Sequence, residues 1–310
     1  MQKNPMQEVF NQYLNYLQVE RNASQYTVRN YSADLYEFFQ FVRSRGFATH
    51  SELDRNAVRG YLSHLTELGI AKASIARKLS AIRSYYRYLL REEIISESPV
   101  AYTSSPKLDK RLPEFLTIAE IKRLIEAPDL STPLGLRDRA FLELLYASGL
   151  RVSELVKLNV EQLNLDTREI RVWGKGSKER MTLMGEPAAR AIAAYINQGR
   201  PQLLSGKGTN ALFLNRYGGR LTVRSVQSLL QEYANRIGIG KRVHPHVLRH
   251  TFATHLLDGG ADLRVVQELL GHASLSSTQI YTHVSKSQAR KVYLTAHPLA
   301  RETDNESQIK

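Results

Sequence analysis

Residues 103–113 read Thr-Ser-Ser-Pro-Lys-Leu-Asp-Lys-Arg-Leu-Pro, a polar, basic stretch between two regions rich in periodic apolar residues. Its two prolines and its lack of a helical apolar repeat predict an extended linker. A chain of 310 residues also exceeds what one hydrophobic core usually serves. The sequence therefore predicts two domains, residues 1–102 and 114–298, and a polar tail, 299–310, which we expect to be disordered.

Basic residues are in excess, and the excess lies mostly in the second domain. The chain has 43 Lys and Arg against 30 Asp and Glu, a net charge of +13. Between residues 200 and 250 a single acid, Glu232, stands among nine basic residues. A clustered basic excess favours a polyanionic partner, because each neutralised phosphate releases counterions. The alternative is a solvated basic surface, so charge alone indicates nucleic acid only weakly. The candidate DNA contacts in this half are Arg220, Arg224, Lys241 and Arg242.

The first hundred residues predict four amphipathic helices. Apolar residues recur at helical spacing over 10–17, 31–42, 61–65 and 75–90. The tetrapeptide Ser-Glu-Leu-Asp from Ser51 resembles a capping box, so we expect the third helix to begin there. Four such helices form a small bundle with its own core. The polar faces of the last helix hold the further candidate DNA contacts, for which a solvated helix face is the alternative: Lys72, Arg77, Lys78 and Arg83.

The second domain predicts an α+β fold. Thr117 and Glu120 form a capping box, and a helix over 137–148 should end at Gly149. Alternation over 168–184 predicts a β-hairpin around Gly-Lys-Gly-Ser. Further helices are expected at about 186–197, 223–237, 246–257 and 262–270, with a last one carrying Ala289, Val292, Tyr293 and Ala296. The fold class is thus mainly α, with a small antiparallel sheet.

Several function classes are excluded by missing residues. The chain has no cysteine, which rules out disulfides, a Cys zinc site and thiol catalysis. Neither a P-loop nor a dinucleotide fingerprint is present. No apolar run is long enough to cross a bilayer, and the first residues carry no apolar signal segment. We therefore expect a cytoplasmic protein with no membrane contact.

The richest motif is His-Pro-His-Val-Leu-Arg-His at 244–250. Two histidines four apart on a helix could bind zinc, and a zinc hydrolase on His244, His246 and His250 is one interpretation. However, no carboxylate lies between them, and Arg249 would repel a divalent cation. If Pro245 starts the helix, His246 and Arg249 share one face near its positive end, which favours an anion.

Five motifs together closely resemble the tyrosine recombinase family, in its order and spacing. They are Gly-Leu-Arg-Val-Ser-Glu-Leu from 149, Gly-Lys-Gly-Ser-Lys-Glu-Arg from 174, the histidine motif from 246, Leu-Gly-His from 270 and Thr-Gln-Ile-Tyr-Thr-His from 278. The resemblance covers almost the whole chain. It implies a core-binding, SAM-like bundle at 1–102 and a catalytic domain at 114–298. The chain's ending and compact length resemble the Xer branch.

The resemblance also implies roles for six residues. Tyr281 matches the nucleophile that forms a 3′-phosphotyrosyl bond. Arg151 and Arg249 match the phosphate-holding arginines, and guanidinium suits bidentate contacts to phosphate oxygens. His246 matches the proton acceptor, and Lys175 matches the proton donor to the leaving 5′ oxygen. His272 matches a residue that donates a hydrogen bond to the phosphate. We expect no metal ion or other cofactor, because these cations and a helix dipole already supply positive charge.

What the resemblance implies about partners follows the family. We expect a clamp on duplex DNA and a homotetramer, or a heterotetramer with a paralogous recombinase, on a recombination site. A DNA translocase could activate it, and the protein should be nucleoid-associated. The stripe Ala289, Val292, Tyr293, Ala296 is expected to dock on a neighbouring subunit. Chromosome dimer resolution at a dif-like site is the favoured role; an integrase of a mobile element and a DNA-binding relative without catalysis are the alternatives.

Overall fold

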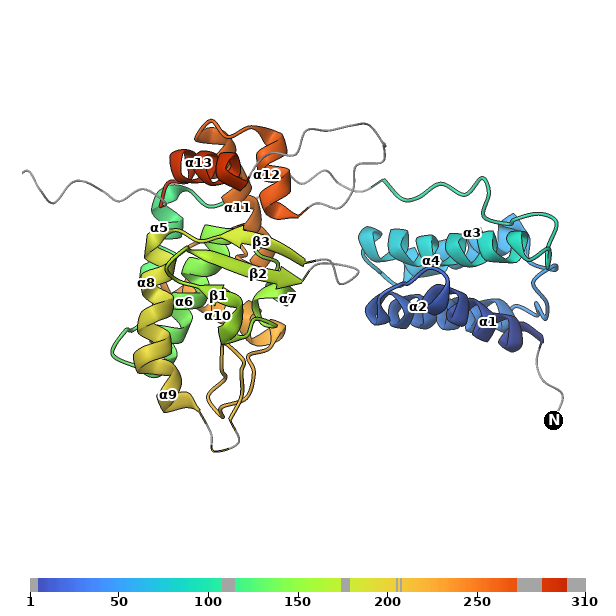
Figure 1. The fold of residues 1–310 in the computed structure, drawn as a ribbon. Coiled ribbons are helices and arrows are strands. Elements are labelled where there is room, and N and C mark those ends of the chain that lie inside the picture. The colour runs from blue at the N-terminus through green and yellow to red at the C-terminus, as the bar shows by residue number, and fades with distance from the viewer. Residues whose placement is uncertain are drawn as a thin grey trace, which may run out of the picture. The chain divides into compact units, whose positions relative to one another are not determined.

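The chain forms two compact units, residues Met1–Arg111 and Leu112–Lys310, in a computed structural model. The structure describes residues 5–107, 115–173, 179–204, 206, 208–271 and 286–299. Each unit has its own hydrophobic core and is described by itself. Figure 1 shows the elements of both units.

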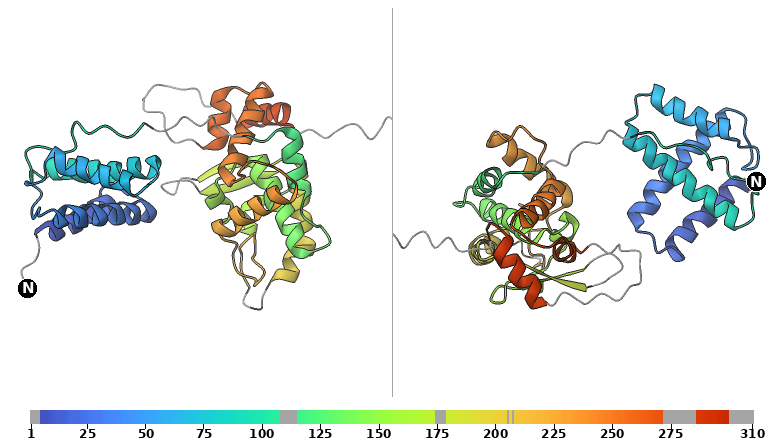
Figure 2. Two further views of the ribbon diagram at one scale, coloured as in Figure 1. Left: turned by 180° about the vertical axis from the view of Figure 1, so that it is seen from behind. Right: turned by 90° about the horizontal axis from the view of Figure 1, so that it is seen from above.

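The first unit is a four-helix bundle, as the apolar periodicity predicts. Its helices are α1 (Pro5–Val19), α2 (Gln25–Ser44), α3 (Arg55–Glu67) and α4 (Lys72–Arg91). Aromatic rings fill the centre of the bundle: Tyr13, Phe38 and Tyr85 are fully buried, and Tyr13 meets Tyr85 edge to face at 5.1 Å. Two views in Figure 2 show the four helices packed side by side.

The start of α3 differs from the sequence prediction. The N-cap is Asp54, whose carboxylate accepts the backbone N–H of Ala57 at 2.8 Å, so the helix begins three residues later than Ser51. The carboxylate of Glu52 instead accepts the backbone N–H groups of Ala48 and Thr49, at 2.7 and 3.2 Å. Because the Glu52 carboxylate closes the preceding turn, the helix starts only at Asp54, a residue type that caps helices as well as serine does.

The second unit is built around α6 (Pro133–Ser148), which is buried almost all round. Asp138 on this helix is buried, pairs with Arg137 and accepts the hydroxyl of Tyr233 at 2.7 Å. The predicted capping box of Thr117 and Glu120 is confirmed at the start of α5. The surrounding helices are α5 (Ile118–Glu126), α7 (Val152–Leu155), α8 (Glu186–Ala194), α9 (Arg200–Leu203), α10 (Val223–Arg236), α11 (Pro245–Asp258), α12 (Leu263–Leu270) and α13 (Lys286–Ala296), with a 3₁₀ turn at Val160–Gln162 and a π-helical turn at Tyr195–Gly199.

A three-stranded antiparallel sheet completes this unit, in the order β1 (Leu163–Asn164), β2 (Glu169–Trp173) and β3 (Glu179–Leu183). The predicted hairpin is confirmed, and β1 is an additional strand. Ile170 pairs with Thr182 and Val172 with Arg180, so these four side chains share the inner face. On the same strand Met181 is 37% exposed, whereas Thr182 is buried.

Helices α11, α12 and α13 form a second cluster at one end of this unit (Figure 1). Phe252 of α11, Val265 of α12 and Tyr293 of α13 are all buried within it. β3 lies at the edge of the sheet nearer to this cluster, and Leu183 packs against it. The end of α12 is therefore brought close to the sheet, where the candidate site lies.

Candidate active site

Arg151 is positioned by a sharp turn after α6. The helix ends at Gly149, which has a left-handed φ of 58°. A Cβ at this position would lie 2.5 Å from Cδ1 of Phe252, so glycine is required both by the backbone and by the packing. Arg151 then becomes the N-cap of α7, with its side chain 39% exposed.

Glu154 holds Arg151 from one turn further along. Oε1 of Glu154 accepts the Arg151 guanidinium at 3.1 Å, and Oε2 accepts the Arg151 backbone N–H at 2.9 Å. The Glu154 side chain is only 7% exposed. Glu154 therefore orients Arg151 through a direct, two-point contact.

Arg249, from α11, reaches the same region. It donates to the backbone carbonyl of Gly149 and, at 2.6 Å, to that of Leu270. Arg151 donates to the next carbonyl, that of Gly271, at 3.3 Å. Both arginines thus cap the negative end of α12. Burial, and next the charge of Arg151, lower the pKa of Arg249 to about 10.

Arg180, from β3, is a third arginine in this group, and our reading of the sequence gave it no role. It donates to Oε2 of Glu154 at 3.0 Å, and its side chain is 17% exposed. Burial lowers its pKa. An inward position on a strand is a period-two signal, and Val172 opposite it is a core residue; that register could have indicated a buried arginine.

We call Arg151, Arg180, Arg249 and Glu154 the arginine cluster. Within the described residues, Glu154 is the only carboxylate that pairs with any of these arginines; it bonds Arg151 and Arg180, whereas Arg249 donates to backbone carbonyls. Three guanidinium groups against one carboxylate leave an excess of two positive charges in a half-buried site. Such an excess favours an anion with several oxygens, such as a phosphate.

His246 is exposed at the beginning of α11, directly after the N1 proline, Pro245. It precedes Arg249 by three positions on the same helix. The ring of His246 lies 6.0 Å from that of His244. Among the residues that the structure describes, no three His, Asp or Glu side chains are gathered so that they could hold a metal ion. The described histidines therefore do not assemble the zinc site considered from the sequence.

Three of the six predicted catalytic residues lie outside the described residues: Lys175, His272 and Tyr281. Lys175 belongs to the connection between β2 and β3, and His272 directly follows Gly271, whose carbonyl accepts Arg151. Lys175 and His272 thus belong to chain segments that adjoin elements of the arginine cluster, β3 and the end of α12.

The candidate DNA contacts in the first unit divide into two kinds. Lys72 and Arg77 are exposed, although Arg77 also pairs with Asp34. Arg83 donates to Ser105 Oγ at 2.8 Å and to the carbonyl of Thr103. Lys78 requires a correction: it is 8% exposed and bonds Asp34 at 3.4 Å and Glu37 at 2.7 Å. Because carboxylates occupy its ammonium group inside the bundle, Lys78 is a structural residue, not a phosphate contact.

The candidates in the second unit divide in the same way. Arg224 and Arg242 are exposed. Lys241 donates to Glu120 at 3.0 Å. The guanidinium of Arg220 is already engaged, since it donates to the carbonyls of Val156 and Leu158, at 3.0 and 2.9 Å, and to Asn159. Arg220 therefore closes a loop of its own domain.

The last helix packs on its own domain. Tyr293 is 1% and Ala296 7% exposed, in the cluster with α11 and α12, and Val292 packs against them. The ring of Tyr293 stacks on that of His297 at 5.2 Å. In this single chain the stripe is covered by its own domain, and its docking on a neighbouring subunit stays a prediction. The side chain of Ala289 lies outside the described residues.

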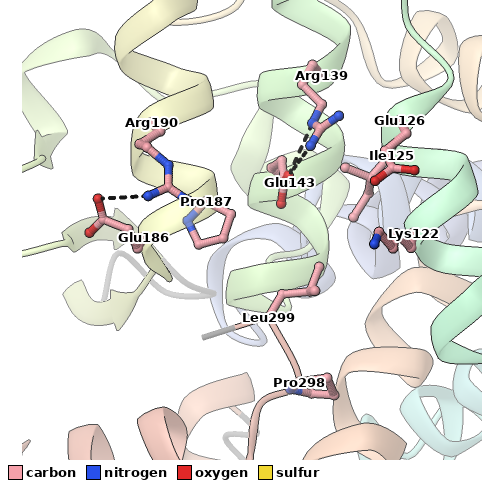
Figure 3. Close-up of a pocket in the computed structure, with 10 residues that line it drawn as sticks. All are labelled: Lys122, Ile125, Glu126, Arg139, Glu143, Glu186, Pro187, Arg190, Pro298 and Leu299. Atoms are coloured by element: carbon pink, nitrogen blue, oxygen red, sulfur yellow. Dashed lines mark hydrogen bonds and ion pairs between the residues drawn. The ribbon is translucent and has the colours of Figure 1, made fainter. Parts of the chain in front are cut away.

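A separate surface cavity of about 220 Å³ lies between α5, α6 and α8, away from the arginine cluster (Figure 3). Arg139 and Glu143 pair with each other on one wall, and Arg190 and Glu186 pair on another. Its charges are mutually compensated, so it lacks the unbalanced positive charge of the arginine cluster.

In the described ranges, no helix is both long and apolar enough to span a bilayer.

Comparison with known proteins assigns both units. Residues 114–288 match the phage integrase family, and residues 10–93 match the phage integrase N-terminal SAM-like domain. A tyrosine recombinase XerC from Pelotomaculum thermopropionicum is 48% identical over 298 residues, covering 93% of this chain and 97% of that protein. A tyrosine recombinase XerD from Staphylococcus epidermidis is 43% identical over 295 residues, covering 95% of this chain and 100% of that protein.

Solved structures show the same fold. The Tn1549 transposon integrase in complex with circular intermediate DNA has a TM-score of 0.69 at 20% identity, covering 91% of this chain and 98% of that one. The XerH site-specific recombinase bound to a palindromic difH substrate has a TM-score of 0.66 at 24% identity, covering 92% and 80%. The chain therefore belongs to the phage integrase family of tyrosine recombinases, in its Xer branch, and is an enzyme that transfers DNA strands.

Proposed function

We propose that Arg151 and Arg249 of the arginine cluster hold the scissile phosphate of a DNA recombination site, and that Tyr281 cleaves it. The observation that carries the proposal is the charge imbalance of the cluster: it holds three guanidinium groups but one carboxylate, that of Glu154, which bonds Arg151 and Arg180 and not Arg249. A phosphodiester would offset this excess, and its oxygens match the geometry of guanidinium donors. The positive charge would stabilise the transition state most, because negative charge develops on the phosphate oxygens during phosphoryl transfer.

The proposed chemistry exchanges one phosphate ester for another. The phenolic oxygen of Tyr281 attacks phosphorus, and His246 accepts the phenolic proton. The 5′ oxygen leaves with a proton from Lys175, so a 3′-phosphotyrosyl ester and a free 5′-hydroxyl result. Arg151, Arg249 and His272 bind the non-bridging oxygens. Attack by the 5′-hydroxyl of a partner strand reverses the step without ATP, because the bond energy is kept in the ester.

The biological role that we favour is chromosome dimer resolution at a dif-like site, through two strand exchanges and a Holliday junction. Its support is the set of relatives named XerC and XerD, and a XerH structure that holds a palindromic difH substrate. The active form would be a tetramer on duplex DNA, with itself or a paralogous recombinase. The same proposal places the protein in the cytoplasm, associated with the nucleoid, and includes its activation by a DNA translocase.

A nicked suicide duplex tests the chemistry. The protein is incubated with duplexes carrying candidate dif-like sites, and covalent adducts are separated on a denaturing gel. We expect an adduct with the wild type and none with Tyr281→Phe, which differs by one oxygen and should retain DNA affinity. Adduct formation by Tyr281→Phe would overturn the assignment of the nucleophile.

Two further arms separate the alternatives. EDTA should leave adduct formation unchanged, whereas loss of the adduct with EDTA would support a metal-dependent mechanism. Cleavage of a dif-like site distinguishes chromosomal resolution from the integrase role; cleavage confined to the ends of a mobile element would contradict it. DNA binding without any adduct would indicate a relative that has lost catalysis.

A further inference from the structure

Arg180 occupies a place between two parts of the site. On one side it donates to Oε2 of Glu154 at 3.0 Å, the same oxygen that accepts the Arg151 backbone N–H. On the other side its guanidinium lies against Gly271, where an added Cβ would collide with the Arg180 side chain. Gly271 has a left-handed φ of 65°, so both its backbone and this contact require glycine.

Arg180 is not placed to bind DNA itself. One terminal nitrogen is used by Glu154, and the other, Nη1, is buried and has no hydrogen-bond partner among the described residues. By contrast, the Arg151 side chain is 39% exposed. Arg151 is thus the exposed cation of the pair, and Arg180 is the buried one, which contacts the same carboxylate, Glu154.

The carboxylate of Glu154 connects the two arginines. With Arg180 on Oε2, Arg151 bonds Oε1 through one guanidinium nitrogen and keeps its other terminal nitrogen on the Gly271 carbonyl. Without Arg180, Glu154 could turn both oxygens toward the Arg151 guanidinium, because bidentate pairing is the preferred arginine–carboxylate geometry. The donors of Arg151 would then face the carboxylate and not a phosphate.

We propose that Arg180 is a positioning residue for strand cleavage: it fixes Glu154, and through it the orientation of Arg151, while its side chain packs against Gly271 at the end of α12. This inference rests on the proposed phosphate-binding role of Arg151. Because Arg180 lies on β3, directly after the connection that carries Lys175, it ties that hairpin to the end of α12.

A double-mutant cycle tests the proposal. Arg180→Gln removes the charge and keeps an amide donor; Arg180→Lys keeps a cation and serves where the glutamine variant does not fold. In the wild-type background we expect Arg180→Gln to slow single-turnover adduct formation about tenfold or more, with DNA affinity within about threefold. In a Glu154→Gln background the same change should cost less than about threefold, because the connecting carboxylate is gone. Arg180→Lys should recover part of the rate.

The matched control lies on the same hairpin. Arg171 on β2 is 57% exposed and pairs with Glu179 across the strands, outside the arginine cluster. Arg171→Gln should leave the adduct rate unchanged. A loss from Arg180→Gln of equal size in both backgrounds would overturn the proposal, since it would mean that Arg180 acts independently of Glu154. An unchanged rate in the wild-type background would overturn it as well.

A second readout does not depend on cleavage. Inorganic phosphate should raise the Tm of the wild type above its value in chloride of equal ionic strength. Arg180→Gln should reduce this rise, and in the Glu154→Gln background it should have no further effect. If the wild type forms no adduct, the proposed function fails, and this phosphate measurement alone decides the role of Arg180: equal loss in both backgrounds, or no loss, overturns it.

Discussion

The two units each contain a partly buried group of charges, and the two groups are built differently. In the helical bundle, Arg77 and Lys78 face Asp34 and Glu37, two cations against two carboxylates. In the second unit, the three cations Arg151, Arg180 and Arg249 are accompanied by one carboxylate, Glu154, which bonds the first two. The first group is complete by itself and stabilises a fold. The second carries an excess of charge that a phosphate would offset, so the imbalance marks the site.

Among the arginines of the cluster, the effect on chemistry should be largest for Arg249. Arg249→Gln should lower the rate of adduct formation by about 10²–10³-fold, the usual cost of removing one donor to a developing charge. Its fold should survive, because glutamine can still donate to one of the two carbonyls, and repulsion with Arg151 is relieved. Single-turnover cleavage and circular dichroism check both. Near-wild-type cleavage would show that the excess charge has no catalytic use.

Lys78 should behave in the opposite way. Lys78→Met leaves Asp34, which is 3% exposed, with Arg77 alone and should destabilise the bundle by about 2–3 kcal/mol, a value below that of a fully buried pair because Glu37 is half-exposed. Amide hydrogen exchange in α2 and α4 measures the loss. Cleavage per folded molecule should be unchanged; a reduced rate at full folding would mean that the balanced group also serves DNA. Asp34→Asn with Lys78→Met should restore part of the stability.

Acid should weaken both units to a similar extent. Burial lowers the pKa of His50 in the bundle to about 4, and of His297 in the second unit to about 3. Each folded-state pKa lies below the unfolded value of 6.5, so the unfolded chain takes up the proton first. Each of the two structural units therefore becomes less stable as the pH falls below about 6.5. The total loss between pH 7 and pH 5 should be about 2 kcal/mol in each.

The measurement is urea unfolding at the two pH values, followed separately in each unit by hydrogen exchange. His50→Gln should remove most of the pH dependence of the bundle only, and His297→Gln that of the second unit only. A pH dependence that survives both changes would assign it to other groups.

The smallest effect is expected on the hairpin surface. Arg171 and Glu179 are 57% and 43% exposed, so their ion pair is screened by water. Arg171→Gln or Glu179→Gln should change the free energy of unfolding by less than about 0.5 kcal/mol. Thermal unfolding checks this, and a larger loss would show that exposure does not separate functional from incidental ion pairs in this chain.

Local patterns predicted most of the fold. The capping box of Thr117 and Glu120 and the end of α6 at Gly149 depend on residues a few positions apart, which the sequence displays directly. The resemblance also identified Arg151 and Arg249, which the fold brings to the same helix end.

What escaped prediction depends on partners far along the chain. Lys78 has the spacing of a polar helix face, but its carboxylates come from α2, more than forty residues earlier. Arg180 became visible only once strand register placed it inward and α12 ended beside it. Neither contact leaves a local pattern, since each joins elements that meet only in the folded domain.

The contact between Gly271 and Arg180 has a consequence for how such sequences can diverge. Any side chain at position 271 would displace a long residue at position 180, and a left-handed backbone further restricts the replacement. The two positions are thus bound to a shared evolutionary history. Among homologues, a chain that has lost the glycine should also have a shorter residue at position 180. The change at position 180 should come first, because a short residue there leaves room for a side chain at position 271.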